Sequence, residues 1–425
     1  MRHQIPTDPN SDARFREKVS AIISELCDGL VRVDARFVEE AVYGIAQSGS
    51  VRLTAISHAL KEDIPIHATH KRLSRNLGHK AVGEVLLSNL LARGVEQLKD
   101  DSLLVLNTME VEKKYAEKMA FLGEIDNKGQ RKGQRKGYEM CEILAAGNLS
   151  QADRTVETLV DGEKIIADIA SQRDFVPVTQ TLWSRSAPEF EGVNQQILNL
   201  VGQIREQSGS NGIVVCNREQ DDRQLLQTWA ESAPDRFIVR QQMGSQLQYR
   251  NSTKSVEELI ESCATPYGAT VFAYGNHNPH EENGYFVHFG FIPVRLPEAP
   301  DRQLNLVVFK GLDGPIALLT TEPMRRNRAV IQDVLEAYFK AWSVRVTSRF
   351  MKQDYQFADV RVLTYDRLKN MAALLSVLTF MDTLWPGGEA TVKGVRFERR
   401  KGAHDLPVYH IHQRRKNALR KIAEL

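Results

Sequence analysis

Four cationic side chains lie along the segment YFKAWSVRVTSRFMK, Tyr338–Lys352, which contains no acid. They are Lys340, Arg345, Arg349 and Lys352. Ammonium and guanidinium groups pair with phosphate oxygens, and the planar guanidinium does so bidentately. A hard divalent cation instead requires oxygen ligands, carboxylates above all. The segment has the pattern of a helix face, so it predicts phosphate binding and offers no ligand for a metal ion.

A second cationic segment, NKGQRKGQRKGY, spans Asn127–Tyr138 and contains a tandem GQRK unit. Its cations are Lys128, Arg131, Lys132, Arg135 and Lys136. Between two predicted strands it would form an extended hairpin loop, and its one-signed charge suits the backbone of DNA or RNA. The alternative interpretation is a solvated, flexible turn.

A third group of cations lies in a helical N-terminal region, residues 13–98, whose apolar residues recur at intervals of three and four. Within it, a short helix at 54–60, a turn at 62–65 and a second helix resemble a helix-turn-helix. The second helix carries His70, Lys71, Arg72 and Arg75. These side chains could meet phosphates and base edges. The alternative is a plain helical bundle with a solvated basic face.

The whole chain is not a basic protein. Its 425 residues are 42% hydrophobic and 26% charged, and the formal net charge is only +2, so a nucleic-acid surface has to be local. No run of about 18 apolar residues predicts a membrane span. Four widely spaced cysteines without a CxxC pair favour reduced thiols in a cytoplasmic protein. Residues 1–12 have no apolar core of a signal peptide and predict a disordered arm.

The centre of the chain predicts a mixed α/β sheet. SLLVLNT and GIVVCN are continuous apolar runs typical of strands buried on both faces, and helix patterns follow the second run. YEMCEILAAG, FVPVTQTLWS and DRFIVRQQ are further predicted strands. The predicted organisation is a helical, DNA-binding domain at 13–98, a first core part at 99–242, a β-rich insertion at 243–300, a second core part with long helices at 301–390, and a basic tail at 391–425.

Four segments in this order resemble the bacterial insertion-sequence DDE transposases, cut-and-paste enzymes with an RNase H-like core. LLVLNTMEVEKKYAEKM resembles the first motif of that family, and GIVVCNREQDDRQLL followed by RFIVR resembles the second. GPIALLTTEP resembles the strand before the last motif. The segment from Tyr338 to Lys352 resembles the last motif, Y-x2-R-x3-E-x6-K. The resemblance covers about residues 103–384 and implies an RNase H-like mixed sheet with a β-rich insertion.

The family chemistry uses three carboxylates that hold two metal ions at the scissile phosphate. At the matching positions this chain has Asn107, Asn217 and Arg345, and Ala341 replaces the motif arginine. An amide keeps the shape of a carboxylate but lacks its charge, and a permanently charged guanidinium repels a metal ion. The resemblance therefore implies no catalytic residue and no metal cofactor.

Two sets of residues bear on other interpretations. Acids near the replaced positions could rebuild a metal site for Mg²⁺ or Mn²⁺, but Glu110 and Asp354 are spaced to point away from it. A cluster of His277, His280 and His288 could hold a transition metal, although a polar surface loop is the preferred interpretation.

The resulting hypothesis is a domesticated or decayed transposase-like protein that binds double-stranded DNA for regulation or targeting without cleaving it. The DNA-binding residues expected from the motifs are Arg345, Lys352, Tyr338, Arg218, Arg349, Lys113, Lys114 and the cations of the two other basic segments. The resemblance implies a homodimer, and we expect it to be associated with the nucleoid. The alternatives are an active metal-dependent recombinase that uses displaced acids, and a scaffold that binds a protein or an RNA.

Overall fold

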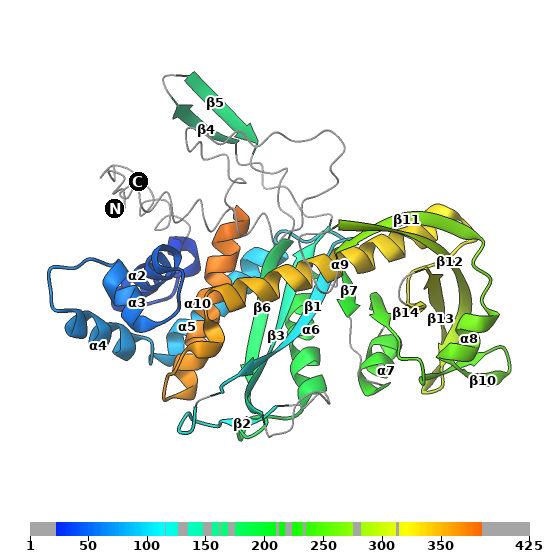
Figure 1. The fold of residues 1–425 in the computed structure, drawn as a ribbon, viewed down its shortest axis with the longest axis horizontal. Coiled ribbons are helices and arrows are strands. Elements are labelled where there is room, and N and C mark those ends of the chain that lie inside the picture. Colours follow the sequence, from blue (N-terminus) through cyan, green and yellow to red (C-terminus); the bar gives the residue numbers. More distant parts are fainter. Residues whose placement is uncertain are drawn as a thin grey trace.

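The computed structural model describes most of the chain between residues 23 and 384. The described ranges are 23–114, 116–125, 135–147, 155–160, 163–168, 175–209, 212–216, 223–232, 235–274, 282–311 and 314–384. Helices pack on one large mixed sheet, so the protein has the α/β fold that the sequence predicts (Figure 1).

The N-terminal region is helical, as predicted. Its helices are α2 (Arg32–Ser48), α3 (Leu53–Ala59), α4 (Ile66–Asn76) and α5 (Lys80–Val95). Helix α2 buries Phe37, Ala41 and Ile45, which share one face at a spacing of four residues. It ends at Gly49, whose φ of 64° lies in the left-handed region that glycine adopts without strain. Helices α3 and α4 occupy the two positions of the predicted helix-turn-helix.

One asparagine fastens this helical region to the C-terminal helix α10 (Tyr365–Leu384). The Asn370 amide donates to the carbonyl oxygens of Leu77 and His79 at 2.8 and 2.9 Å, and it accepts from the Gly83 N–H at 3.0 Å. A Cβ atom at Gly83 would lie 2.4 Å from the Asn370 side-chain oxygen, so only glycine fits there. The helical region and the core therefore pack as neighbours.

Five strands form the centre of the sheet. They are β1 (Leu103–Glu112), β3 (Lys136–Ala146), β6 (Phe175–Trp183), β7 (Ile213–Cys216) and β8 (Phe237–Arg240). Their order is β6-β3-β1-β7-β8; β3 is antiparallel to β6 and to β1, whereas β1, β7 and β8 are parallel. This is the strand arrangement of an RNase H-like sheet. The predicted strands correspond to these elements.

The sheet continues beyond β8 through antiparallel strands. These are β14 (Ile316–Thr320), β13 (Ala299–Lys310), β12 (Glu282–Leu296), β9 (Gln246–Tyr249) and β10 (Ser252–Ser255), with β11 (Tyr267–Tyr274) paired to β12. The β-rich segment at 243–300 thus extends the core sheet. It also contains α8 (Val256–Ser262), which begins at a Ser255/Glu258 capping box. Outside this extension, β2 (Gly123–Glu124) pairs with β3, and β4 (Thr155–Val160) pairs with β5 (Glu163–Asp168).

Helices cover both faces of the central strands (Figure 1). The remaining elements are α6 (Val193–Ser208), α7 (Arg223–Glu231), α9 (Arg328–Asp354) and the short 3-10 helix η2 (Phe357–Asp359). Alternate β1 residues point to opposite faces. Val105 packs in the cluster that contains Val334 and Ala341 of α9, whereas Leu106 packs in the cluster of the other helices. Asn107 shares the face of Val105 and therefore faces α9.

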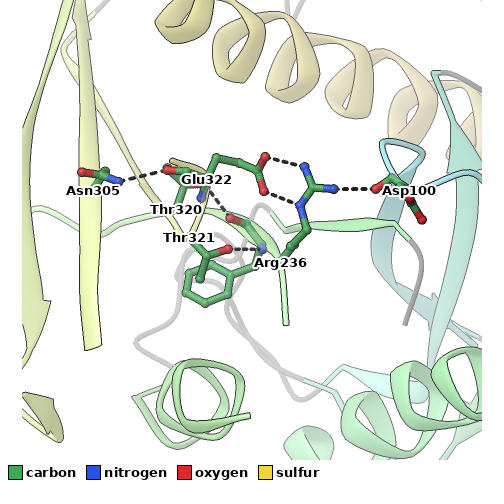
Figure 2. A network of polar contacts seen from close by, with 7 residues as sticks. Asp100, Arg236, Asn305, Thr320, Thr321 and Glu322 are labelled. Atoms are coloured by element: carbon green, nitrogen blue, oxygen red, sulfur yellow. Dashed lines mark hydrogen bonds and ion pairs between the residues drawn. The ribbon is translucent and has the colours of Figure 1, made fainter. Parts of the chain in front are cut away.

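A polar network ties the edge of the central sheet to its extension (Figure 2). The Arg236 guanidinium bonds both carboxylate oxygens of Glu322, at 2.8 and 2.5 Å, and donates to the Asp100 carbonyl oxygen at 2.6 Å. The carbonyl oxygen of Glu322 in turn accepts from the Asn305 amide at 2.9 Å. The network joins segments that precede β1 and β8 to the end of β14.

Replacing Glu322 with Gln is expected to lower the free energy of unfolding by about 1–3 kcal/mol, because Arg236 loses a charged, bidentate partner. Urea unfolding measures the effect. The matched control is Glu84→Gln, since Glu84 is 63% exposed and pairs with Lys80 within one helix; its effect is expected to stay below about 0.5 kcal/mol. Equal effects of the two substitutions would contradict a structural role of the network.

Candidate functional site

Asn107 forms a buried polar cluster with residues of β3 and α9. It lies opposite Glu142 in the β1–β3 ladder, and its side-chain nitrogen donates to Glu142 Oε1 at 2.8 Å. The Ser348 hydroxyl, from α9, also donates to Glu142 Oε1. All three residues are buried. The position of the first family carboxylate therefore holds an amide that serves as a hydrogen-bond donor to a neighbouring acid.

This arrangement explains why an amide is suited to position 107. An ionised aspartate at that position has no proton to donate, so it would place a second negative oxygen beside Glu142 in a buried site. Glu142 was not among the site residues predicted from the sequence. One feature of the sequence could have indicated it: Glu142 is a charged residue among apolar neighbours in the predicted strand YEMCEILAAG. The β1–β3 register that sets it beside Asn107 was not predicted.

Arg345 lies one helical turn before Ser348 on α9, and its side chain is buried, with 9% exposed. Within the described part of the chain, neither of its terminal nitrogens, Nη1 and Nη2, has a hydrogen-bond partner, and both are hidden from solvent. Burial lowers the pKa of the Arg345 guanidinium, and the positive charge of Arg240 acts in the same direction. Cys216 and Tyr338 oppose this shift of the pKa.

The residues around Arg345 come from the carboxyl ends of two parallel strands. Cys216 is the last residue of β7, and Arg240 is the last residue of β8. Arg240 Nη1 lies 3.5 Å from the Tyr338 hydroxyl oxygen, so two arginines approach the same tyrosine on α9. In open α/β sheets, ligands bind outside the carboxyl ends of parallel strands. The predicted site residues Tyr338 and Arg345 therefore lie near each other, and Arg240, which was not predicted from the sequence, lies beside Tyr338.

Lys113 lies elsewhere and is not available to a phosphate. Its ammonium group is buried and donates to the carbonyl oxygens of Phe357, Ala358 and Val360 at 2.9, 3.0 and 3.0 Å. Its three N–H groups thus hold the turn between α9 and α10. This corrects the expectation that Lys113 faces a DNA backbone. The structural reason is that the carbonyl groups at the end of the short helix η2 point at this ammonium group and accept its N–H groups.

The stability of the protein is expected to rise with pH between about 7 and 10.5. Burial lowers the pKa of Lys113 from 10.5 to about 7, while the charge of Asp359 opposes the shift. In that window the unfolded state binds the proton that the folded state has lost, so the slope reaches up to about 1.4 kcal/mol per pH unit. Below pH 7 both states bind the proton, so the stability no longer changes with pH through Lys113. The measurement is Tm against pH for the wild type and Lys113→Met; parallel curves would contradict it.

Two further predicted DNA-binding cations are paired within the chain. Arg72 contacts Glu40 and Glu62, each at 2.8 Å. Arg135 contacts Glu110 at 2.7 Å and Glu112 at 3.1 Å. The charge of these arginines is thus neutralised locally, which the sequence spacing did not predict because it depends on tertiary contacts.

Some of the remaining predicted site residues are exposed, and the structure does not describe the others or their side chains. Lys71, Arg75, Lys114 and Lys136 are exposed. Lys136 begins strand β3, so the predicted loop from 127 to 138 ends earlier than expected. Outside the described residues or side chains lie Asn217, Arg218, Lys128, Arg131, Lys132, Arg349, Lys352, His277 and His280. His288 is exposed on β12.

The described residues offer neither a metal-binding cluster nor a membrane-spanning helix. No three side chains of His, Cys, Asp or Glu in the described ranges gather closely enough to hold a metal ion. In the same ranges, no helix combines the length and apolar character needed to cross a membrane.

Comparison with known proteins gives a structural similarity and no match in sequence. No protein-family model matches the chain, and no curated protein matches it in sequence. Among solved structures, the chain is similar to a piggyBac transposase in a synaptic complex with hairpin DNA, with a TM-score of 0.42 and 11% identity over 100% of this chain and 73% of that one. A similarity at this level says nothing of what this chain binds.

Proposed function

We propose that this protein binds double-stranded DNA through exposed cations of its helical N-terminal region and of its RNase H-like core, and does not cut it. The observation that carries the proposal is the state of Asn107. Its side chain occupies the position of the first metal-binding carboxylate implied by the transposase resemblance, and it donates to Glu142 at 2.8 Å. A donor directed at an acid is the reverse of what a metal-binding oxygen needs.

Arg345 supports the same proposal through its charge. It replaces the third carboxylate with a permanent positive charge. A guanidinium at this place repels a divalent cation and attracts phosphate. The site thereby lacks the means to activate water through two metals. Because Arg345 is buried, the attraction for a duplex has to come from exposed cations elsewhere.

Exposed cations supply the surface for the duplex. Lys71 and Arg75 lie four residues apart on α4, so they share one face of the second helix of the predicted helix-turn-helix. Lys114 and Lys136 are exposed together at the end of the β1–β3 ladder, where the Lys113 N–H bonds the Lys136 carbonyl oxygen at 2.8 Å. Neutralised arginines such as Arg72 are assigned no phosphate contact.

The test of DNA binding is fluorescence anisotropy of a labelled duplex titrated with protein at several salt concentrations. The double variant Lys71→Gln with Arg75→Gln is expected to weaken binding and to flatten the slope of log K against log salt by about 2. The matched control removes two exposed cations from other helices, Arg36→Gln with Lys80→Gln, whose side chains are 68% and 73% exposed. Equal effects of the two double variants would contradict a role for α4.

The test of inactivity is nicking of a supercoiled plasmid with Mn²⁺ or Mg²⁺. We expect no metal-dependent nicks. The competing function is an active recombinase, and one observation favours it: Glu142 is an acid buried beside the first metal position. Nicking that Glu142→Gln abolishes would establish that function, and absence of any DNA binding would favour the protein- or RNA-binding scaffold.

A further inference from the structure

The terminal nitrogens of Arg345 have no partner in a site where a partner is required. Nη1 and Nη2 are both hidden from solvent and make no hydrogen bond with the residues that the structure describes. Buried polar groups are almost always hydrogen-bonded, and an unpaired buried charge is far more costly than an unpaired neutral group. Among the described residues, the guanidinium therefore lacks a negatively charged hydrogen-bond acceptor.

The residues around Arg345 indicate which kind of ligand could pair with its guanidinium. The described residues whose charges act on its guanidinium are Cys216, Tyr338 and Arg240, and none of them is Asp or Glu. Arg240 adds a second guanidinium, and its Nη1 lies 3.5 Å from the Tyr338 hydroxyl oxygen. Two guanidinium groups and a tyrosine hydroxyl offer several donors to one acceptor. An anion with several oxygens satisfies such a set, as phosphate does.

The position of the cluster also fits a ligand site. Cys216 and Arg240 end the adjacent parallel strands β7 and β8, where open α/β sheets bind ligands. Tyr338 and Arg345 approach from α9, which crosses this face of the sheet (Figure 1). The donors thus come from two separate elements, β8 and α9, beside the end of β7.

We propose that Arg345, Arg240 and Tyr338 form a site for a single phosphate group. Because the Arg345 nitrogens are hidden from solvent, the phosphate has to be enclosed by the protein. The continuous backbone of an intact duplex is excluded from such a place. The phosphate is either a free ion or the terminal phosphate of a DNA strand, and the second source rests on the proposed DNA-binding function.

The experiment measures the Tm of the full chain with inorganic phosphate and with chloride at equal ionic strength. Phosphate is expected to raise the Tm of the wild type by at least about 2 °C. Arg345→Met and Arg240→Gln are expected to lose this response. Arg36→Gln removes an exposed arginine from α2 and serves as the control that keeps it.

A second arm compares duplexes with and without 5′-terminal phosphates by anisotropy. If the source is a strand end, the phosphorylated duplex is expected to bind the wild type about tenfold or more tightly, and Arg345→Met to remove the difference. A phosphate-induced rise in Tm without this difference assigns the site to the free ion. Two results would overturn the proposed site. One is that Arg345→Met shows the same rise in Tm and the same duplex preference as the wild type; the other is that the wild type shows neither.

The experiments distinguish a failure of the phosphate site from a failure of the DNA-binding function. If Arg345→Met binds DNA as the wild type does and neither protein responds to phosphate, the DNA-binding function stands and the phosphate site is wrong. If phosphate raises the Tm through Arg345 but no duplex binds, the phosphate site stands and the DNA-binding function is wrong.

Discussion

Replacing Arg345 with methionine is expected to raise the free energy of unfolding by about 1–4 kcal/mol in phosphate-free buffer. Methionine has a flexible apolar side chain of similar length, so it fills the buried space without the charge. The wild type has to bury a guanidinium whose two terminal nitrogens have no partner. Removing that charge removes a desolvation cost that no hydrogen bond offsets. Chemical denaturation of both proteins measures the difference.

Arg345→Lys is the companion variant for this prediction. It keeps a positive charge in the same buried place, and an ammonium is more strongly hydrated than a guanidinium. It is therefore expected to give no gain in stability. A loss of stability in Arg345→Met would contradict the prediction, because it would mean that the guanidinium has a partner in solution. A gain that disappears as phosphate is added would agree with a phosphate-binding role.

Replacing Lys113 with methionine is expected to lower the free energy of unfolding by about 3 kcal/mol or more. The ammonium group donates to three carbonyl oxygens in the turn after α9. The Phe357 carbonyl also accepts from the Val360 N–H, so methionine leaves the carbonyls of Ala358 and Val360 without a donor among the described residues. Each buried unsatisfied acceptor costs about 1–3 kcal/mol. The packing of the aliphatic stem is retained, so the loss reports the carbonyl contacts.

The adjacent exposed residue gives the control for Lys113. Lys114→Met removes the same charge from the next position and is expected to change stability by about 0.5 kcal/mol or less. Urea unfolding of both variants at pH 7 makes the comparison. If the two substitutions cost the same, Lys113 does not hold the turn.

The central strands could be predicted from sequence because burial on both faces leaves a strong local signal. Continuous apolar runs such as SLLVLNT and GIVVCN indicate such strands without any tertiary information. The long helices predicted within 301–390 are likewise present, as α9 and α10. The helix α8 was missed because its seven residues lie within a segment dominated by strands, and only its capping box marked it.

The chemistry of the site could be predicted only in part. Motif spacing identified Asn107, Tyr338 and Arg345, which lie on the face between the sheet and α9. Glu142 and Arg240 enter the site through strand register and strand order, which depend on distant parts of the chain. Motif position could not reveal that Lys113 is buried, because its partners are carbonyls about 245 positions further along. The homodimer, the nucleoid location and the origin from an insertion sequence stay predictions.

The most direct test of the account is capture of fragmented genomic DNA by the purified full chain, with and without Mn²⁺, followed by sequencing of the bound positions and their ends. Binding without cleavage predicts discrete enriched sites whose ends do not change with metal. New ends at one sequence that appear only with Mn²⁺ would contradict it and establish a working recombinase.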